Sequence, residues 1–118
     1  MTSPGLPEWS TWKQLESAPY TIGIEEEVML LGSEDCALAN RVESVMPRLP
    51  EPLLDQATRE TQNSVIELCT RVHTEVGAAA EQLGQLREEL ADSIAKLGLR
   101  AASAGMHPFA IWEEIAVT

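Results

Sequence analysis

The chain has 118 residues and a formal net charge of −11 at pH 7. Its length suits one small domain or part of a larger one, and its 44% content of hydrophobic residues is ordinary for a globular protein. Only eight Lys and Arg side chains are spread along it, which excludes nucleic acid as a partner and makes cations the more natural ligands.

The start of the chain is rich in proline, and we predict an irregular leader over residues 1–19. This segment lacks the basic start and apolar run of a signal peptide. No apolar stretch in the chain approaches the roughly 18 residues of a membrane span. We therefore expect a cytoplasmic protein with no membrane contact, in which Cys36 and Cys69 are free thiols.

The first predicted strand is the apolar run Tyr20–Leu31, which three consecutive glutamates interrupt. Because strand side chains alternate between two faces, Glu25 and Glu27 are expected on one face and Glu26 on the other, with the apolar residues. Massed negative charge in a half-buried strand is costly unless a cation compensates, so the pattern indicates a divalent metal or a basic ligand. The alternative is a solvated patch that protects a sheet edge from aggregation.

Shorter elements are predicted next along the chain. We expect a turn at Gly32–Asp35 and a short returning strand at Cys36–Leu38. Apolar residues at helical spacing predict a short helix within Asn40–Leu49, which Pro47 limits. After the prolines that follow, Leu53-Leu54 is expected to begin another extended piece.

The second half of the chain predicts a strand, a long helix and a strand. Alternation over Asn63–Val72 predicts a strand with Glu67 within it. A helix is expected from Thr74, as N-cap, to about Leu97, and Gly98 ends it. Its predicted apolar stripe is Val76, Ala80, Leu83, Leu86, Leu90, Ile94 and Leu97. We predict that this helix lies on a sheet rather than in a coiled coil, and that Leu99–Ala104 adds a third strand, giving an α+β fold.

The acids of the two strands form the candidate metal site. If the strands are neighbours, Glu25, Glu27 and Glu67 converge, and Mg²⁺ prefers such oxygen ligands together with nucleotide phosphates. Glu60 is a further candidate ligand. The alternative for Glu60 is a solvated turn residue beside Arg59.

Three motifs resemble, in order and spacing, those of the carboxylate-amine ligase family, also called glutamate-cysteine ligase type 2. They are Gly-Ile-Glu-Glu-Glu at Gly23–Glu27, Asn-Ser-Val-Ile-Glu-Leu-Cys-Thr at Asn63–Thr70, and Ala-Gly-Met-His-Pro-Phe-Ala-Ile-Trp at Ala104–Trp112. The resemblance implies an antiparallel sheet and a glutamine synthetase-like catalytic fold. It also implies Mg²⁺ and ATP, which phosphorylates the γ-carboxylate of glutamate before an amine such as cysteine attacks the acyl phosphate.

Carried over by residue, Glu25 and Glu27 resemble the Glu-x-Glu pair of the family's first strand, and Glu67 resembles the acid of its second. Thr70 and His107 lie in motifs that imply substrate or nucleotide binding, although a hydrogen bond that fixes the turn is an alternative role for His107. The resemblance assigns no catalytic residue.

The chain also departs from the family pattern. Val65 stands where such proteins commonly have Gln, Arg71 where they have Pro, and Met106 where they have Thr. Family members run to several hundred residues, so the resemblance implies that residues 20–118 are the N-terminal part of a ligase catalytic domain, incomplete alone.

Two other interpretations of the chain stay open at this point. The first is a catalytically silent fragment or split subunit that associates with itself or with a complementary chain. The second is an unrelated acidic helical protein whose glutamates are only solvated.

Overall fold

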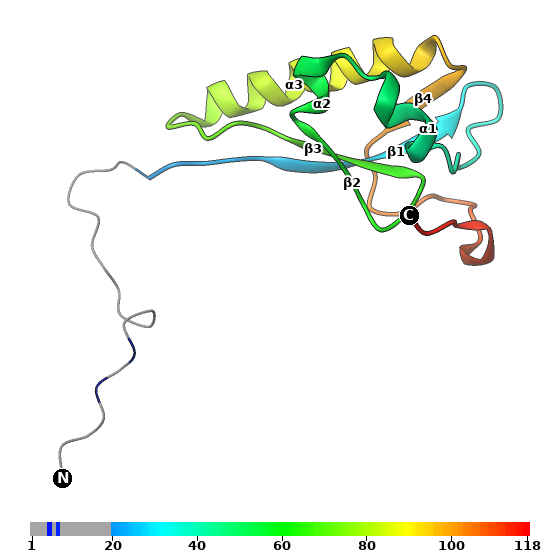
Figure 1. The fold of residues 1–118 in the computed structure, drawn as a ribbon, viewed down its shortest axis with the longest axis horizontal. Helices are drawn as coiled ribbons and strands as arrows, with labels where there is room; N and C mark the ends of the chain where they lie inside the picture. Colours follow the sequence, from blue (N-terminus) through cyan, green and yellow to red (C-terminus); the bar gives the residue numbers. More distant parts are fainter. Residues whose placement is uncertain (1–4, 6, 8–19) are drawn as a thin grey trace.

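The computed structural model describes Gly5, Pro7 and residues 20–118, so the predicted leader lies outside the described residues except at those two positions. The described part is an α+β unit in which one long helix covers one face of an antiparallel sheet (Figure 1). Its strands are β1 (Glu25–Gly32), β2 (Ala57–Arg59), β3 (Val65–Cys69) and β4 (Leu99–Ala102). Its helices are α1 (Val42–Val45), η2 (Met46–Arg48), α2 (Glu51–Leu54), α3 (Val76–Ala95) and η3 (Trp112–Glu114).

The first of the described strands, β1, lies inside the sheet, whose strand order is β2-β3-β1-β4. One edge of β1 pairs with β3, where Glu27 faces Glu67, and the other pairs with β4, where Met29 faces Ala102. The three main predicted strands are confirmed as β1, β3 and β4, although each is shorter than expected. We did not predict β2, a three-residue strand that is exposed at two of its positions.

The core lies between the sheet and α3. Even-numbered residues of β1 and β3 point to this side, so the alternation that we predicted is confirmed. The buried residues of this layer are Val28, Leu30, Ile66 and Leu68 from the strands and Ala79, Leu83, Leu86, Leu90 and Ile94 from the helix. A helix on a sheet is therefore the arrangement, and the coiled coil is wrong.

The start of α3 differs from the prediction. Val76 and Ala80 are exposed, and Ala79 is buried because it lies one turn before Leu83 on the same line. The N-cap is Glu75 rather than Thr74, and no side chain caps it. At the other end, Gly98 has φ +71°, the left-handed conformation that commonly terminates a helix at glycine.

Two predictions about the connecting segments are wrong. Leu53-Leu54 belongs to α2 rather than to an extended piece, because Pro52 stands in the first turn, where a missing N–H breaks no helical bond. Cys36–Leu38 forms no strand, since Cys36 has φ +55° and only Leu38 makes an isolated bridge, to Leu31. The predicted short helix within Asn40–Leu49 is confirmed as α1 and η2.

Ser64 is a polar side chain inside this core. It is fully buried, and within the described part of the chain its hydroxyl has no hydrogen-bond partner. Because an unpaired buried hydroxyl costs free energy, we expect Ser64→Ala to raise the free energy of unfolding by about 1 kcal/mol. Urea unfolding measures the change in stability, and Ser44→Ala is the control, because it removes an exposed hydroxyl that is bonded to Arg41 and should not raise the stability. A loss of stability would show that the hydroxyl is satisfied.

Among the described residues, no helix is both long and apolar enough to cross a membrane.

Candidate functional site

The face of the sheet opposite α3 carries the predicted acids. Glu25 and Glu27 are exposed on β1, and across the ladder Glu25 faces Cys69 while Glu27 faces the half-buried Glu67. Thr58 Oγ1 donates a hydrogen bond of 2.9 Å to Glu67 Oε2, which fixes that carboxylate. The structure thus places three of the four predicted ligands on one face. At Glu25 and Glu27 this face is open to solvent.

These carboxylates have no cationic partner in the described residues, because the ion pair found there joins Arg87 to Glu26 on the other face. Within residues 5, 7 and 20–118, no three His, Cys, Asp or Glu side chains are grouped so as to hold a metal ion. Glu27 and Glu67 are therefore a cross-strand pair, and a metal that they bound would need additional oxygen ligands.

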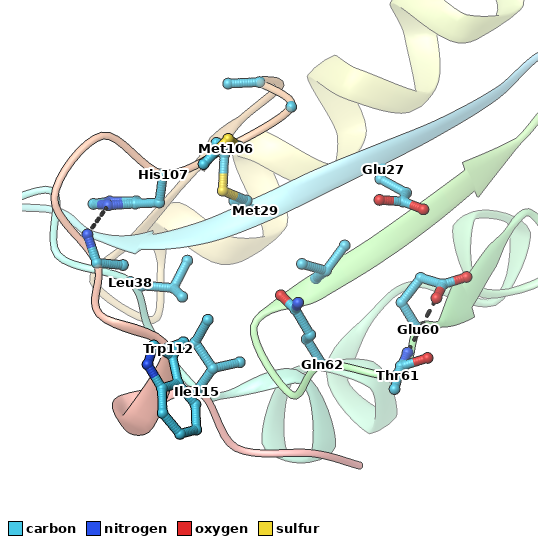
Figure 2. Close-up of a pocket in the computed structure, with 14 residues that line it drawn as sticks. Glu27, Met29, Leu38, Glu60, Thr61, Gln62, Met106, His107, Trp112 and Ile115 are labelled. Carbon is cyan, nitrogen blue, oxygen red and sulfur yellow. Dashed lines mark hydrogen bonds between the residues drawn. The ribbon is translucent and has the colours of Figure 1, made fainter.

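A pocket of about 450 Å³ opens beside this pair. Glu27 and Met29 of β1 line it together with Glu60, and Figure 2 shows these side chains among those that line the pocket. One wall is formed by the segment 104–107 and by Trp112. Glu60 lies in the loop after β2, where its Oε2 accepts a hydrogen bond of 3.1 Å from Thr61 N, and it lines the pocket together with Glu27.

His107 lies in the pocket wall with both ring nitrogens engaged. Nδ1 accepts a hydrogen bond of 3.0 Å from Ala110 N, and Nε2 lies 2.9 Å from the carbonyl oxygen of Cys36. Since Nδ1 accepts, the proton belongs on Nε2, which donates to that carbonyl. The turn-fixing hydrogen bond that we gave as the alternative role is present. Ligand binding by His107 stays a prediction.

Thr70 connects the ends of two strands and does not line the pocket. Its Oγ1 accepts a hydrogen bond of 2.9 Å from Ile24 N and donates one of 3.0 Å to Arg71 O. This geometry gives Thr70 a role in holding the start of β1 against the end of β3. A contact from Thr70 to substrate or nucleotide remains a prediction.

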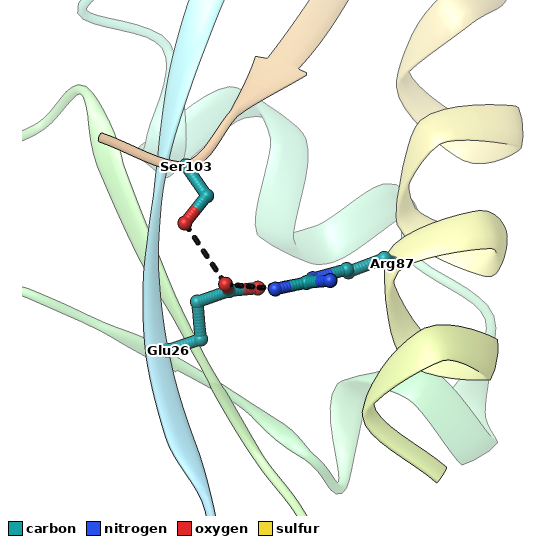
Figure 3. Close-up of polar contacts among 3 residues, drawn as sticks. All are labelled: Glu26, Arg87 and Ser103. Carbon is teal, nitrogen blue, oxygen red and sulfur yellow. Dashed lines mark hydrogen bonds and ion pairs between the residues drawn. The ribbon is translucent and has the colours of Figure 1, made fainter. Parts of the chain in front are cut away.

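Sequence reasoning placed Glu26 on the helix side of the sheet but missed its partners. Arg87 Nε donates to Glu26 Oε2 over 2.6 Å, Arg87 Nη2 donates to Oε1, and Ser103 Oγ donates to Oε1 over 2.8 Å (Figure 3). The hydrogen bond from Arg87 lowers the pKa of Glu26, against the opposing effect of burial. These partners lie 61 and 77 residues away, beyond any local sequence signal.

The Cys69 thiol lies beside the acidic pair, and its Sγ is 3.7 Å from Glu67 Oε2. Burial, followed by the charge of Glu67, raises the pKa of Cys69. The thiol is therefore protonated at neutral pH and is a weak nucleophile.

The geometry therefore defines a class of site: a pair of glutamates on neighbouring strands, on the open face of the sheet of an α+β protein. The sequence profile of Glutamate-cysteine ligase family 2 matches residues 21–118, and the chain belongs to that family. The resemblance that the three motifs indicated is thus confirmed.

Individual relatives agree with the family. The chain is 36% identical over 105 residues to "Putative glutamate--cysteine ligase 2-1" of Rubrobacter xylanophilus. The aligned region is 89% of this chain and 28% of the relative. It is 34% identical over 100 residues to "Putative glutamate--cysteine ligase 2" of Chromobacterium violaceum, covering 84% of this chain and 26% of that protein. The chain therefore spans about a quarter of the length of the curated relatives it matches.

Proposed function

We propose that this chain is the N-terminal part of an ATP-dependent carboxylate-amine ligase with a glutamine synthetase-like fold, and that residues 20–118 belong to its catalytic domain. The activity is formation of a γ-glutamyl amide from glutamate and an amine such as cysteine, in the cytoplasm. One observation carries the proposal: Glu27 and Glu67 face each other across β1 and β3 on an open sheet face, and no cation among the described residues neutralises them.

The chemistry of these side chains fits Mg²⁺. This ion takes oxygen ligands and is commonly bound by one or two carboxylates together with substrate phosphates, so a pair is sufficient from this part of the protein. Glu27 and Glu67 would hold it, with Glu25 beside them on the same face and Glu60 across the pocket. When bound, Mg²⁺ would supply charge neutralisation for the phosphate oxygens.

The protein's own residues prepare this site in two ways. Thr58 orients the Glu67 carboxylate toward the open face, which lowers the cost of ordering it when a ligand binds. The adjoining pocket, with Glu27 and Glu60 on its walls, offers a place for a substrate next to the pair. His107 and Thr70 are the residues of this chain that we propose for substrate or nucleotide contacts.

The second candidate is a catalytically silent subunit that acts by association with itself or with a complementary chain. The observation in its favour is a group of exposed apolar side chains late in the chain, at Met106, Phe109 and Trp112. The solution mass of the chain tests it. An oligomer that forms without any response to Mg²⁺ or ATP would favour this second candidate over the first.

The test of the ligase proposal is the thermal unfolding midpoint with and without Mg²⁺ and ATP. A ligand that binds only the folded state adds about 1.4 kcal/mol of stability at ten times its Kd, so the midpoint should rise. Glu27→Gln and Glu67→Gln should each abolish that rise, whereas exposed Glu34→Gln should keep it. An equal rise in all three variants would contradict the assignment of the pair.

A further inference from the structure

The Glu26 carboxylate joins three segments that are far apart in the sequence. Glu26 projects from β1, and Arg87 donates to it from α3. Ser103, the residue that follows β4, donates to it as well (Figure 3). The side chain of Glu26 is 14% exposed, whereas that of Arg87 is 53% exposed. Arg87 contacts both carboxylate oxygens, so the plane of the carboxylate is fixed while Oε1 still accepts from Ser103.

Ser103, which donates this hydrogen bond, is the first residue after the strand pairing of β4 ends. Pairing of β4 with β1 ends at Ala102, opposite Met29. Residues 104–107, just beyond Ser103, form one wall of the pocket. Their next anchor is the hydrogen bond from His107 to the carbonyl of Cys36. The wall is thus a short segment held at each end by one side-chain hydrogen bond. The first is from Ser103 to Glu26, and the second is between His107 and the carbonyl of Cys36.

We propose that Glu26, held by Arg87, is a positioning residue that sets the wall of the pocket through Ser103. Glu26 lies on the helix side of the sheet, so it does not touch a ligand on the open face. Its neighbour Glu27 faces the pocket from the other side of the same strand. One strand therefore presents a carboxylate to the pocket through Glu27 and, through the adjacent Glu26, fixes the neighbouring wall. That the positioned wall serves a substrate pocket rests on the proposed function. The hydrogen bonds that position the wall are independent of it.

The experiment is ¹⁵N relaxation of the backbone amides of the full chain, compared between the unmodified protein and Ser103→Ala. This change removes the hydroxyl and leaves the Glu26–Arg87 pair in place. We expect the order parameters of residues 104–107 to fall below about 0.6, the range of flexible backbone, with β3 and α3 unchanged at about 0.85. Ser103→Thr keeps a hydroxyl and should restore the order parameters of the segment. Ser93→Ala, which removes a hydroxyl bonded to Glu89 O within α3, is the matched control and should leave the segment unchanged.

Two results would overturn the proposal. One is unchanged order parameters at residues 104–107 in Ser103→Ala, and the other is a fall in order parameters spread evenly over the sheet and helix, since that would be a general loosening of the fold. The measurement needs neither Mg²⁺ nor ATP. If the unmodified chain shows no Mg²⁺ response but Ser103→Ala frees the wall, the proposed function fails and the positioning role stands. If Mg²⁺ stabilises the chain but Ser103→Ala leaves the wall unaffected, the positioning role fails and the proposed function stands.

Discussion

Replacing Leu90 by alanine is expected to lower the free energy of unfolding by about 3 kcal/mol, because the change removes a fully buried side chain between α3 and the sheet. Leu90 packs in the layer that contains Val28 and Leu68, so the loss includes transfer of the removed atoms and the cavity left behind. Small domains have little stability in reserve, and a loss of this size leaves a substantial unfolded fraction.

Urea unfolding followed by circular dichroism measures the effect. Leu54→Ala is the matched control, since Leu54 is also a helical leucine but is 40% exposed, and its loss should stay below about 1 kcal/mol. Equal losses at the two positions would contradict the placement of the core under α3.

The second large effect is expected from Arg87→Met, which leaves Glu26 mostly buried without its cation. We expect a loss of about 2 kcal/mol at pH 7, because a buried charged acceptor then lacks its main donor. The pKa of Glu26 is lowered in the folded protein from its ordinary value of 4.5. A lowered pKa stabilises the fold above that ordinary value, and the stabilisation is lost as the pH falls through the folded pKa. The difference between the two proteins should therefore shrink progressively below about pH 4.5.

Stability measured from pH 7 to pH 3 tests this dependence. Arg48→Met is the control, because Arg48 is exposed and makes no ion pair in the described part of the chain, and it should change stability little at any pH. A difference for Arg87→Met that stays constant down to pH 3 would show that the lost packing of the arginine stem, rather than its charge, is responsible.

Much of the fold was predictable because its patterns are local. The alternation of Glu25, Glu26 and Glu27 with apolar neighbours defined both faces of β1, and the line from Leu83 to Ile94 defined the buried side of α3. The short β2 was not predictable, since it is a strand only through its pairing with β3. A three-residue segment carries too little alternation to distinguish it from a loop.

Part of the candidate site was also predictable. The alternation of side chains along each strand predicts that Glu27 and Glu67 share a face. Their direct opposition depends on the register of two segments forty residues apart, which no local pattern indicates. The Glu26–Arg87–Ser103 contacts lay beyond sequence reasoning for a similar reason. Arg87 is an ordinary exposed helix residue by its local pattern, and only the packing of α3 against β1 gives it a partner.

The inside position of β1 has a consequence for the order in which the protein folds. Of the four described strands β1 is synthesised first, and neither of its ladders can form until later residues emerge, because Glu27 pairs with Glu67 and Leu30 pairs with Ala101. Helix α3 is local and forms within about a microsecond, whereas closing such distant pairs is slow. On the ribosome, β1 therefore emerges with both edges unpaired and its apolar side uncovered. These four strands can pair fully only after β4, the last of the four in chain order, has emerged.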